Sequence, residues 1–122
     1  MVGSLMYLTV SRPDITLVVM VCARFQSNPK KSHSKAVVRI FHYLKGTPNL
    51  GVWYPQGSDF YLTAYTDADD GGFHVDRKST SGSIQMLGNR LVSWSSKKQN
   101  CVSLSTADSE YITVAHGCSQ VL

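Results

Sequence analysis

The chain has 122 residues, of which 43% are hydrophobic and 16% charged, and twelve Lys and Arg against eight Asp and Glu give a formal net charge of +4. This length suits one ordinary domain or two incomplete ones and allows a packed core, and the composition argues against intrinsic disorder. No apolar run reaches the ~20 residues that span a bilayer, so no membrane partner is expected. The chain has three cysteines that are far apart in sequence: Cys22, Cys101 and Cys118. Their odd number and wide spacing argue against a disulfide framework. They favour a reducing intracellular compartment, the cytoplasm or the nucleus.

The first 46 residues carry helical patterns. Apolar residues recur at helical spacing over residues 15–25, and Asn28-Pro29 ends that segment. A second helix is predicted to start at Ser32 or Ser34 and to end at Gly46.

From Leu50 onward the hydrophobic period becomes that of strands. Strands are predicted at Gly51–Tyr54, Phe60–Asp67, Ser83–Leu87 and Arg90–Trp94. Gly88-Asn89 is a two-residue hairpin signal between the last two of them. The polar stretch from Asp67 to Ser81 is predicted to be a loop.

The last segment, from Ser105 to Leu122, is again helical. Ser105 with Asp108 fits a capping box in which Asp replaces the usual Glu. One apolar stripe is predicted to face the core: Ala107, Tyr111, Val114, Ala115, Cys118, Val121 and Leu122. Helices, then strands, then a helix indicate an α+β protein.

Acidic residues follow the second predicted strand, at Asp67, Asp69 and Asp70, with Asp76 nearby. A carboxylate at a strand end can hold Mg²⁺ rigidly, and a solvated acidic loop is the alternative. Glu110, in the first turns of the last helix, is in most proteins only a partner for the helix dipole. If that helix packs across the sheet near Asp67, the two carboxylates support two-metal phosphodiester hydrolysis.

Basic residues form three groups that are candidates for contact with nucleic acid, which the positive net charge also favours. Lys31, Lys35 and Arg39 are four residues apart on one predicted helix face, and such a row can follow phosphates or simply be solvated. The other two groups are Arg77-Lys78 and Lys97-Lys98. The histidines show no metal-ligand spacing and are interpreted as structural or surface residues: His33, His42, His74 and His116.

The whole chain resembles the Pol polyprotein of copia-type LTR retrotransposons. In the helical part the matching segments are Gly3–Leu8, Ser11–Ile15 and His42–Thr47. In the rest of the chain they are Thr66–Asp69, Asp76–Gly82, Trp94–Gln99 and Leu104–Tyr111.

The resemblance implies a position within that polyprotein. Residues 1–49 resemble the C-terminal helical part of a reverse transcriptase, 50–59 a connecting strand and turn, and 60–122 the N-terminal half of a ribonuclease H-like domain. The implied fold is a truncated mixed sheet with its first helix, from a domain that cuts the RNA of an RNA–DNA hybrid with two Mg²⁺ ions. The family's first catalytic Asp corresponds to Asp67, and the second Glu of its Ala-Glu-Ala-Glu-Tyr run corresponds to Glu110; both would also bind metal.

The chain departs from the family pattern at two places. Asp70-Gly71-Gly72 replaces an aromatic residue followed by Ala-Gly, and Asp108 replaces the first Glu of the helical run. The resemblance places the remaining catalytic carboxylates beyond Leu122 and the polymerase aspartates before Met1. We therefore expect a Pol fragment that is inactive alone and binds Mg²⁺ weakly or not at all, or alternatively a non-catalytic nucleic-acid-binding remnant. The missing neighbouring strand also predicts self-association through an unpaired strand edge.

Overall fold

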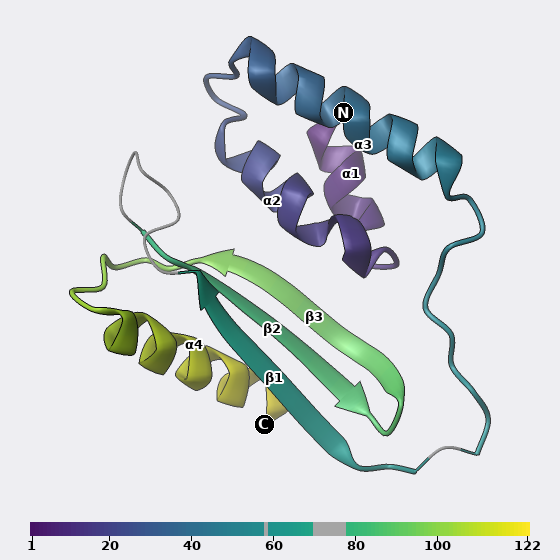
Figure 1. Cartoon of the computed structure of the whole chain (residues 1–122), viewed down its shortest axis with the longest axis vertical. Helices are drawn as coiled ribbons and strands as arrows, with labels where there is room; N and C mark the ends of the chain where they lie inside the picture. The colour runs from purple at the N-terminus through teal and green to yellow at the C-terminus, as the bar shows by residue number, and fades with distance from the viewer. Residues whose placement is uncertain (58, 70–77) are drawn as a thin grey trace. The chain divides into compact units, whose positions relative to one another are not determined.

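The computed structural model describes residues 1–57, 59–69 and 78–122, and the chain divides into two units, Met1–Val52 and Trp53–Leu122 (Figure 1). The first unit is helical, and the second contains a three-stranded antiparallel sheet and one helix, so the predicted α+β class is confirmed. No helix within the described ranges is long and apolar enough to cross a membrane. Several residues that the sequence singles out lie outside these ranges: Asp70-Gly71-Gly72, His74, Asp76 and Arg77.

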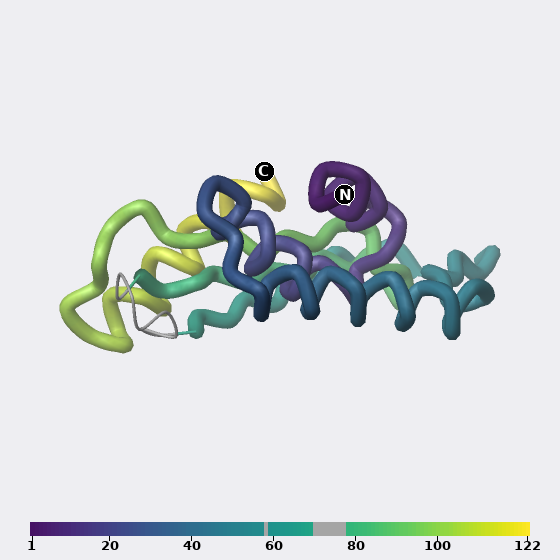
Figure 2. The backbone as a smooth tube through the Cα atoms, turned by 90° about the horizontal axis from the view of Figure 1, so that it is seen from above, coloured from purple at the N-terminus to yellow at the C-terminus, as the bar shows by residue number. Residues whose placement is uncertain are grey.

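The first unit consists of α1 (Val2–Leu8), the short 3-10 helix η1 (Pro13–Ile15), α2 (Thr16–Arg24) and α3 (Lys31–Gly46). Helix α2 contacts both α1 and α3 (Figure 2). The predicted helical segments are confirmed, and their buried residues form a core together with Leu5 of α1: Ile15, Val19, Cys22, Val37 and Ile40. Burial raises the pKa of the Cys22 thiol, which suits a core position rather than a nucleophile.

A polar cluster joins the start of η1 to the end of α3. Arg12 donates to both carboxylate oxygens of Asp14, at 3.0 Å from Nε and 2.8 Å from Nη2, and to the main-chain oxygen of Thr47 at 3.0 Å. The Tyr43 hydroxyl donates to Asp14 at 2.8 Å. The hydrogen bonds from Arg12 lower the pKa of Asp14 from 3.8 to about 2, although burial acts in the opposite direction.

The sheet of the second unit contains β1 (Leu62–Asp69), β2 (Thr80–Leu87) and β3 (Arg90–Lys98), antiparallel in the order β1-β2-β3. Strands β2 and β3 form the predicted hairpin, and Gly88 adopts the positive φ of 60° that favours glycine in such a turn. Strand β1 pairs with β2 along its whole length, and its other edge has no partner strand within the described part of the chain.

One predicted strand is absent, and the predicted loop is too long. Gly51–Tyr54 is not a strand, because no strand of the described chain pairs with it; the Tyr54 hydroxyl instead donates to the main-chain oxygen of Leu91 at 2.9 Å. The polar stretch predicted as a loop is shorter than expected. Strand β1 continues to Asp69 and β2 begins at Thr80, because pairing between the two strands outweighs their polar composition.

Helix α4 (Thr106–Val121) follows β3 and packs on β1 and β2 (Figure 1). Its predicted start is confirmed, since the Ser105 hydroxyl accepts a hydrogen bond from the main-chain N–H of Asp108 at 3.2 Å. This cap satisfies one of the free N–H groups in the first turn of the helix.

The predicted contact face of α4 is wrong. Ser109, Thr113 and Gly117 are buried against the sheet, whereas Tyr111, from the predicted apolar stripe, is 80% exposed. A Cβ atom at Gly117 would overlap the side chain of Thr66 on β1. The helix therefore approaches the sheet so closely that only small residues fit between them.

Buried polar side chains connect α4 to the sheet. The hydroxyl oxygens of Ser81 and Thr113 lie 2.7 Å apart, and Thr113 also donates to the main-chain oxygen of Ser109 at 2.8 Å. Gln99 Nε2 donates to Ser81 Oγ and to that same Ser109 oxygen, both at 3.0 Å, while the Ser103 hydroxyl donates to Gln99 Oε1 at 3.1 Å. We call these five residues the Gln99 cluster.

Candidate carboxylate and nucleic-acid-binding sites

Asp67 lies near the carboxyl end of β1, opposite Gly82 on β2. Successive side chains of a strand point to opposite faces of the sheet. Because Thr66 faces α4 at Gly117, Asp67 faces the side of the sheet that α4 does not cover, and Asp69 shares that side. The Asp67 side chain is exposed and forms no hydrogen bond or ion pair with any residue that the structure describes.

Glu110 lies on the flank of α4 that is turned toward β1. It follows the buried Ser109 by one residue, which is a rotation of about 100° around the helix axis. Ile112 and His116 lie on the other side of Ser109, where they line a cavity with the end of β3. Since β2 separates β1 from β3, the flank with Glu110 faces the β1 edge, and its side chain is exposed.

Asp67 therefore faces the side of the sheet away from α4, whereas Glu110 lies on α4, so the described structure does not bring the two predicted carboxylates onto one face of the sheet. Carboxylate oxygens are ligands that Mg²⁺ prefers. No group of three or more His, Cys, Asp or Glu side chains within residues 1–57, 59–69 and 78–122 is arranged to hold a metal ion. Within the described ranges, Asp67 and Glu110 are therefore not part of a three-ligand cluster that could hold Mg²⁺.

Lys31, Lys35 and Arg39 are all exposed on α3, as a row that is separate from the buried Val37 and Ile40. At 1.5 Å per residue, the row extends over about 12 Å. Helix α3 contains no Asp or Glu, so nothing on the helix itself neutralises these cations. Such a row can bind successive phosphates of a nucleic-acid backbone.

The described part of the second unit holds three further predicted cations. Lys97 and Lys98 end β3, and Lys78, which precedes β2, donates from Nζ to the main-chain oxygen of Asn100 at 2.6 Å. A cavity of about 120 Å³ lies between the end of β3 and α4, and Lys97, Lys98, Asn100 and His116 are among the residues that line it. We call it the β3–α4 cavity.

His116 is the residue that sequence reasoning missed. The sequence indicates a structural or surface residue, because the histidines show no metal-ligand spacing. Only the packing of α4 on the sheet brings His116 to the same cavity as Lys97.

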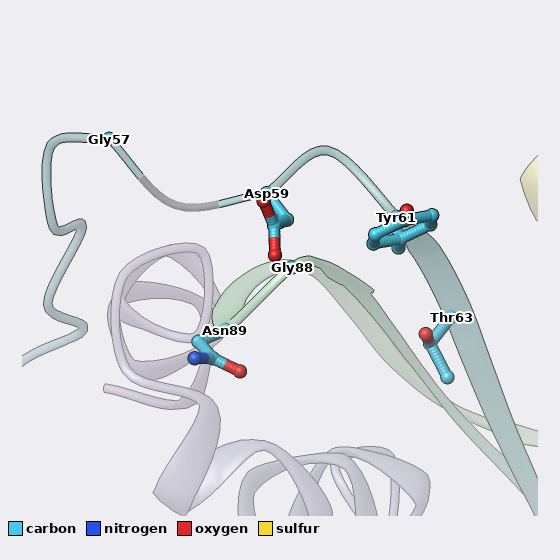
Figure 3. A pocket seen from close by; sticks show the side chains of 6 residues that line it. All are labelled: Gly57, Asp59, Tyr61, Thr63, Gly88 and Asn89. Atoms are coloured by element: carbon cyan, nitrogen blue, oxygen red, sulfur yellow. The ribbon is translucent and has the colours of Figure 1, made fainter.

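A larger, open cavity of about 360 Å³ lies where β1 begins and the β2–β3 hairpin turns (Figure 3). Its lining residues are Gly57, Asp59, Tyr61, Thr63, Gly88 and Asn89. Figure 3 shows the Asp59 side chain directed toward Gly88. Among these described residues, Asp59 is a carboxylate and none is Lys, Arg or His. None of them is a residue that the sequence predicts to be functional, so this cavity is not a candidate site.

Comparison with known proteins shows extensive similarity to transposon sequences. The chain is 44% identical over 120 residues to the retrovirus-related Pol polyprotein from transposon RE1 of Arabidopsis thaliana, a match that covers 98% of the chain and 8% of that protein. It is 47% identical over 112 residues to the corresponding polyprotein from transposon TNT 1-94 of Nicotiana tabacum, covering 91% of the chain and 8% of that protein.

A shorter relative matches over most of its own length. The secreted RxLR effector protein 161 of Plasmopara viticola is 37% identical over 122 residues, which covers 99% of the chain and 86% of that protein. No protein-family profile and no solved structure matches the chain.

Proposed function

Since the chain belongs to the Pol polyprotein family of copia-type retrotransposons, we propose that it is the segment where the reverse transcriptase ends and the ribonuclease H domain begins. The division into a helical unit and a unit with a sheet and a helix supports this proposal. The chain spans 8% of the length of these polyproteins. The resemblance implies that the whole polyprotein synthesises DNA on RNA and cleaves the RNA of RNA–DNA hybrids.

The proposed role of this segment is to contact nucleic acid through α3. The observation that carries it is the exposed row of Lys31, Lys35 and Arg39 on a helix without carboxylates. Each phosphate that a cation neutralises releases counterions, so binding should weaken as salt rises.

The test measures binding of the full chain to an RNA–DNA hybrid at several salt concentrations. Replacing Lys31, Lys35 and Arg39 together by Glu should weaken binding and reduce the log–log salt slope by about three, one for each lost contact. Lys45→Glu, at the end of the same helix but off this row, is the matched control. A triple variant that binds like the parent would refute the role of α3.

Asp67 and Glu110 are proposed to supply part of a Mg²⁺ site of the parent ribonuclease H. The elements that carry them, β1 and α4, are in contact, and the resemblance of these two segments to the family's catalytic motifs supports this proposal. With two carboxylates alone, we expect weak Mg²⁺ binding, because Mg²⁺ keeps several waters unless multiple ligands replace them.

A hybrid-cleavage assay with Mg²⁺ tests this second proposal. The 122-residue chain should not cleave, whereas a version extended by the polyprotein sequence that follows should. In the extended protein, Asp67→Asn or Glu110→Gln should abolish cleavage, and Asp59→Asn, at the far end of the sheet, should not. Cleavage by the unextended chain that is lost on Asp67→Asn would refute the proposal.

The alternative is a non-catalytic nucleic-acid-binding remnant. It predicts the same salt-dependent binding through α3, but no cleavage in the extended protein.

A further inference from the structure

We propose that the β3–α4 cavity is a phosphate-binding site in which Lys97 and His116 hold one phosphate group of a nucleic acid. The choice of a nucleic acid as the source of the phosphate rests on the proposed function. The site itself rests on the geometry and charge of the cavity.

The sheet register places Lys97 beside α4. Lys97 pairs with Ser81, whose hydroxyl lies 2.7 Å from that of Thr113 on α4. Directly paired residues of an antiparallel sheet share a face, so Lys97 is on the face that α4 covers. His116 lies three residues after Thr113, on the flank of α4 that is turned toward β3, and both side chains line the cavity.

The residues that line the cavity carry positive charge. Lys98 also lines it, and the Nζ of Lys78 lies at the neighbouring main-chain oxygen of Asn100. No carboxylate is among its lining residues in the described chain, because Asp108 lines a different cavity and Glu110 is on the opposite flank of α4. Ammonium and imidazole N–H groups are suitable donors to phosphate oxygens.

The wall of the cavity is fixed before any ligand binds. Gln99 and Ser81, which also line it, are 5% and 3% exposed and belong to the Gln99 cluster of hydrogen bonds. A site whose supporting residues are already held in place loses less conformational entropy on binding.

The size of the cavity limits the ligand. About 120 Å³ is well below the roughly 300–1,000 Å³ of pockets that enclose drug-sized molecules. A single phosphate group is therefore the expected occupant, with the rest of the nucleic acid outside.

The test is a two-dimensional NMR titration of the full 122-residue chain with inorganic phosphate, compared with chloride at the same ionic strength. Phosphate should shift the amide signals of residues 97–100 and of His116. Lys97→Ala or His116→Gln should weaken binding by about tenfold, in line with the loss of one charge-assisted hydrogen bond. Lys45→Ala, in the other unit, is the control and should bind like the parent.

A second titration uses a short single-stranded DNA without a terminal phosphate. The same signals should shift, and the triple α3 variant should retain these shifts even though its hybrid binding is weakened. These shifts are therefore expected whether or not α3 binds nucleic acid, so the two proposals can fail separately. Signals that respond no more to phosphate than to chloride would refute the site, and a response to inorganic phosphate alone would refute nucleic acid as its source.

Discussion

Two buried glutamines at the sheet are expected to affect stability in opposite directions. Gln99 is 5% exposed, and its amide donates to Ser81 and to the main-chain oxygen of Ser109 while accepting from Ser103. Gln99→Met keeps the approximate shape but leaves these buried polar groups without their partner. An unsatisfied buried group costs about 1–3 kcal/mol, so we expect a loss of about 2–4 kcal/mol in the free energy of unfolding.

Gln85, on β2, provides the matched comparison. It is 3% exposed, and neither Nε2 nor Oε1 has a hydrogen-bond partner among the residues that the structure describes. Gln85→Met removes two unpaired buried polar atoms and retains the apolar volume. We therefore expect the free energy of unfolding to rise by about 1–2 kcal/mol.

The assay is urea unfolding of the full chain followed by tryptophan fluorescence. Both tryptophans, Trp53 and Trp94, belong to the second unit, so the signal reports on the unit that contains both glutamines. The urea concentration at the unfolding midpoint should be higher for Gln85→Met than for the parent, and lower for Gln99→Met. If both variants lose the same stability, the Gln85 amide is hydrogen-bonded in solution, and the reasoning from buried partners is refuted.

Two further predictions concern Asp14 and the open edge of β1. The fall of the Asp14 pKa from 3.8 to about 2 corresponds to a contribution of at most about 2.4 kcal/mol to the free energy of unfolding. Because the Asp14 side chain is 25% exposed, solvent screening reduces this contribution to about 1 kcal/mol. This stability is present above pH 3.8 and is lost as the pH falls through about 2, so Asp14→Asn should destabilise the helical unit at neutral pH and much less at pH 2, as measured by circular dichroism; equal losses at both would contradict it. The open edge of β1 predicts self-association detectable by light scattering, which Tyr65→Lys should reduce; a parent that stays monomeric at high concentration would contradict this prediction.

The sequence by itself determined the elements that depend on local signals. Helical spacing identified Val19 and Cys22 as core residues, Gly88-Asn89 located the hairpin, and Ser105 marked the start of α4. Each of these signals acts between residues a few positions apart, so the sequence contains all that is needed to interpret it. The sequence also contained the family motifs that the comparisons confirm.

The tertiary structure decided which surfaces meet. A strand exists only when another strand pairs with it, and Gly51–Tyr54 has none in the described chain although its composition favours one. The hydrophobic period of α4 predicted that its apolar stripe packs on the sheet. Instead, the helix lies so close to β1 at Gly117 that the stripe of small residues packs there. That packing turns Glu110 toward β1 and brings His116 to Lys97. Such pairs depend on contacts between distant segments, which no local spacing in the sequence encodes.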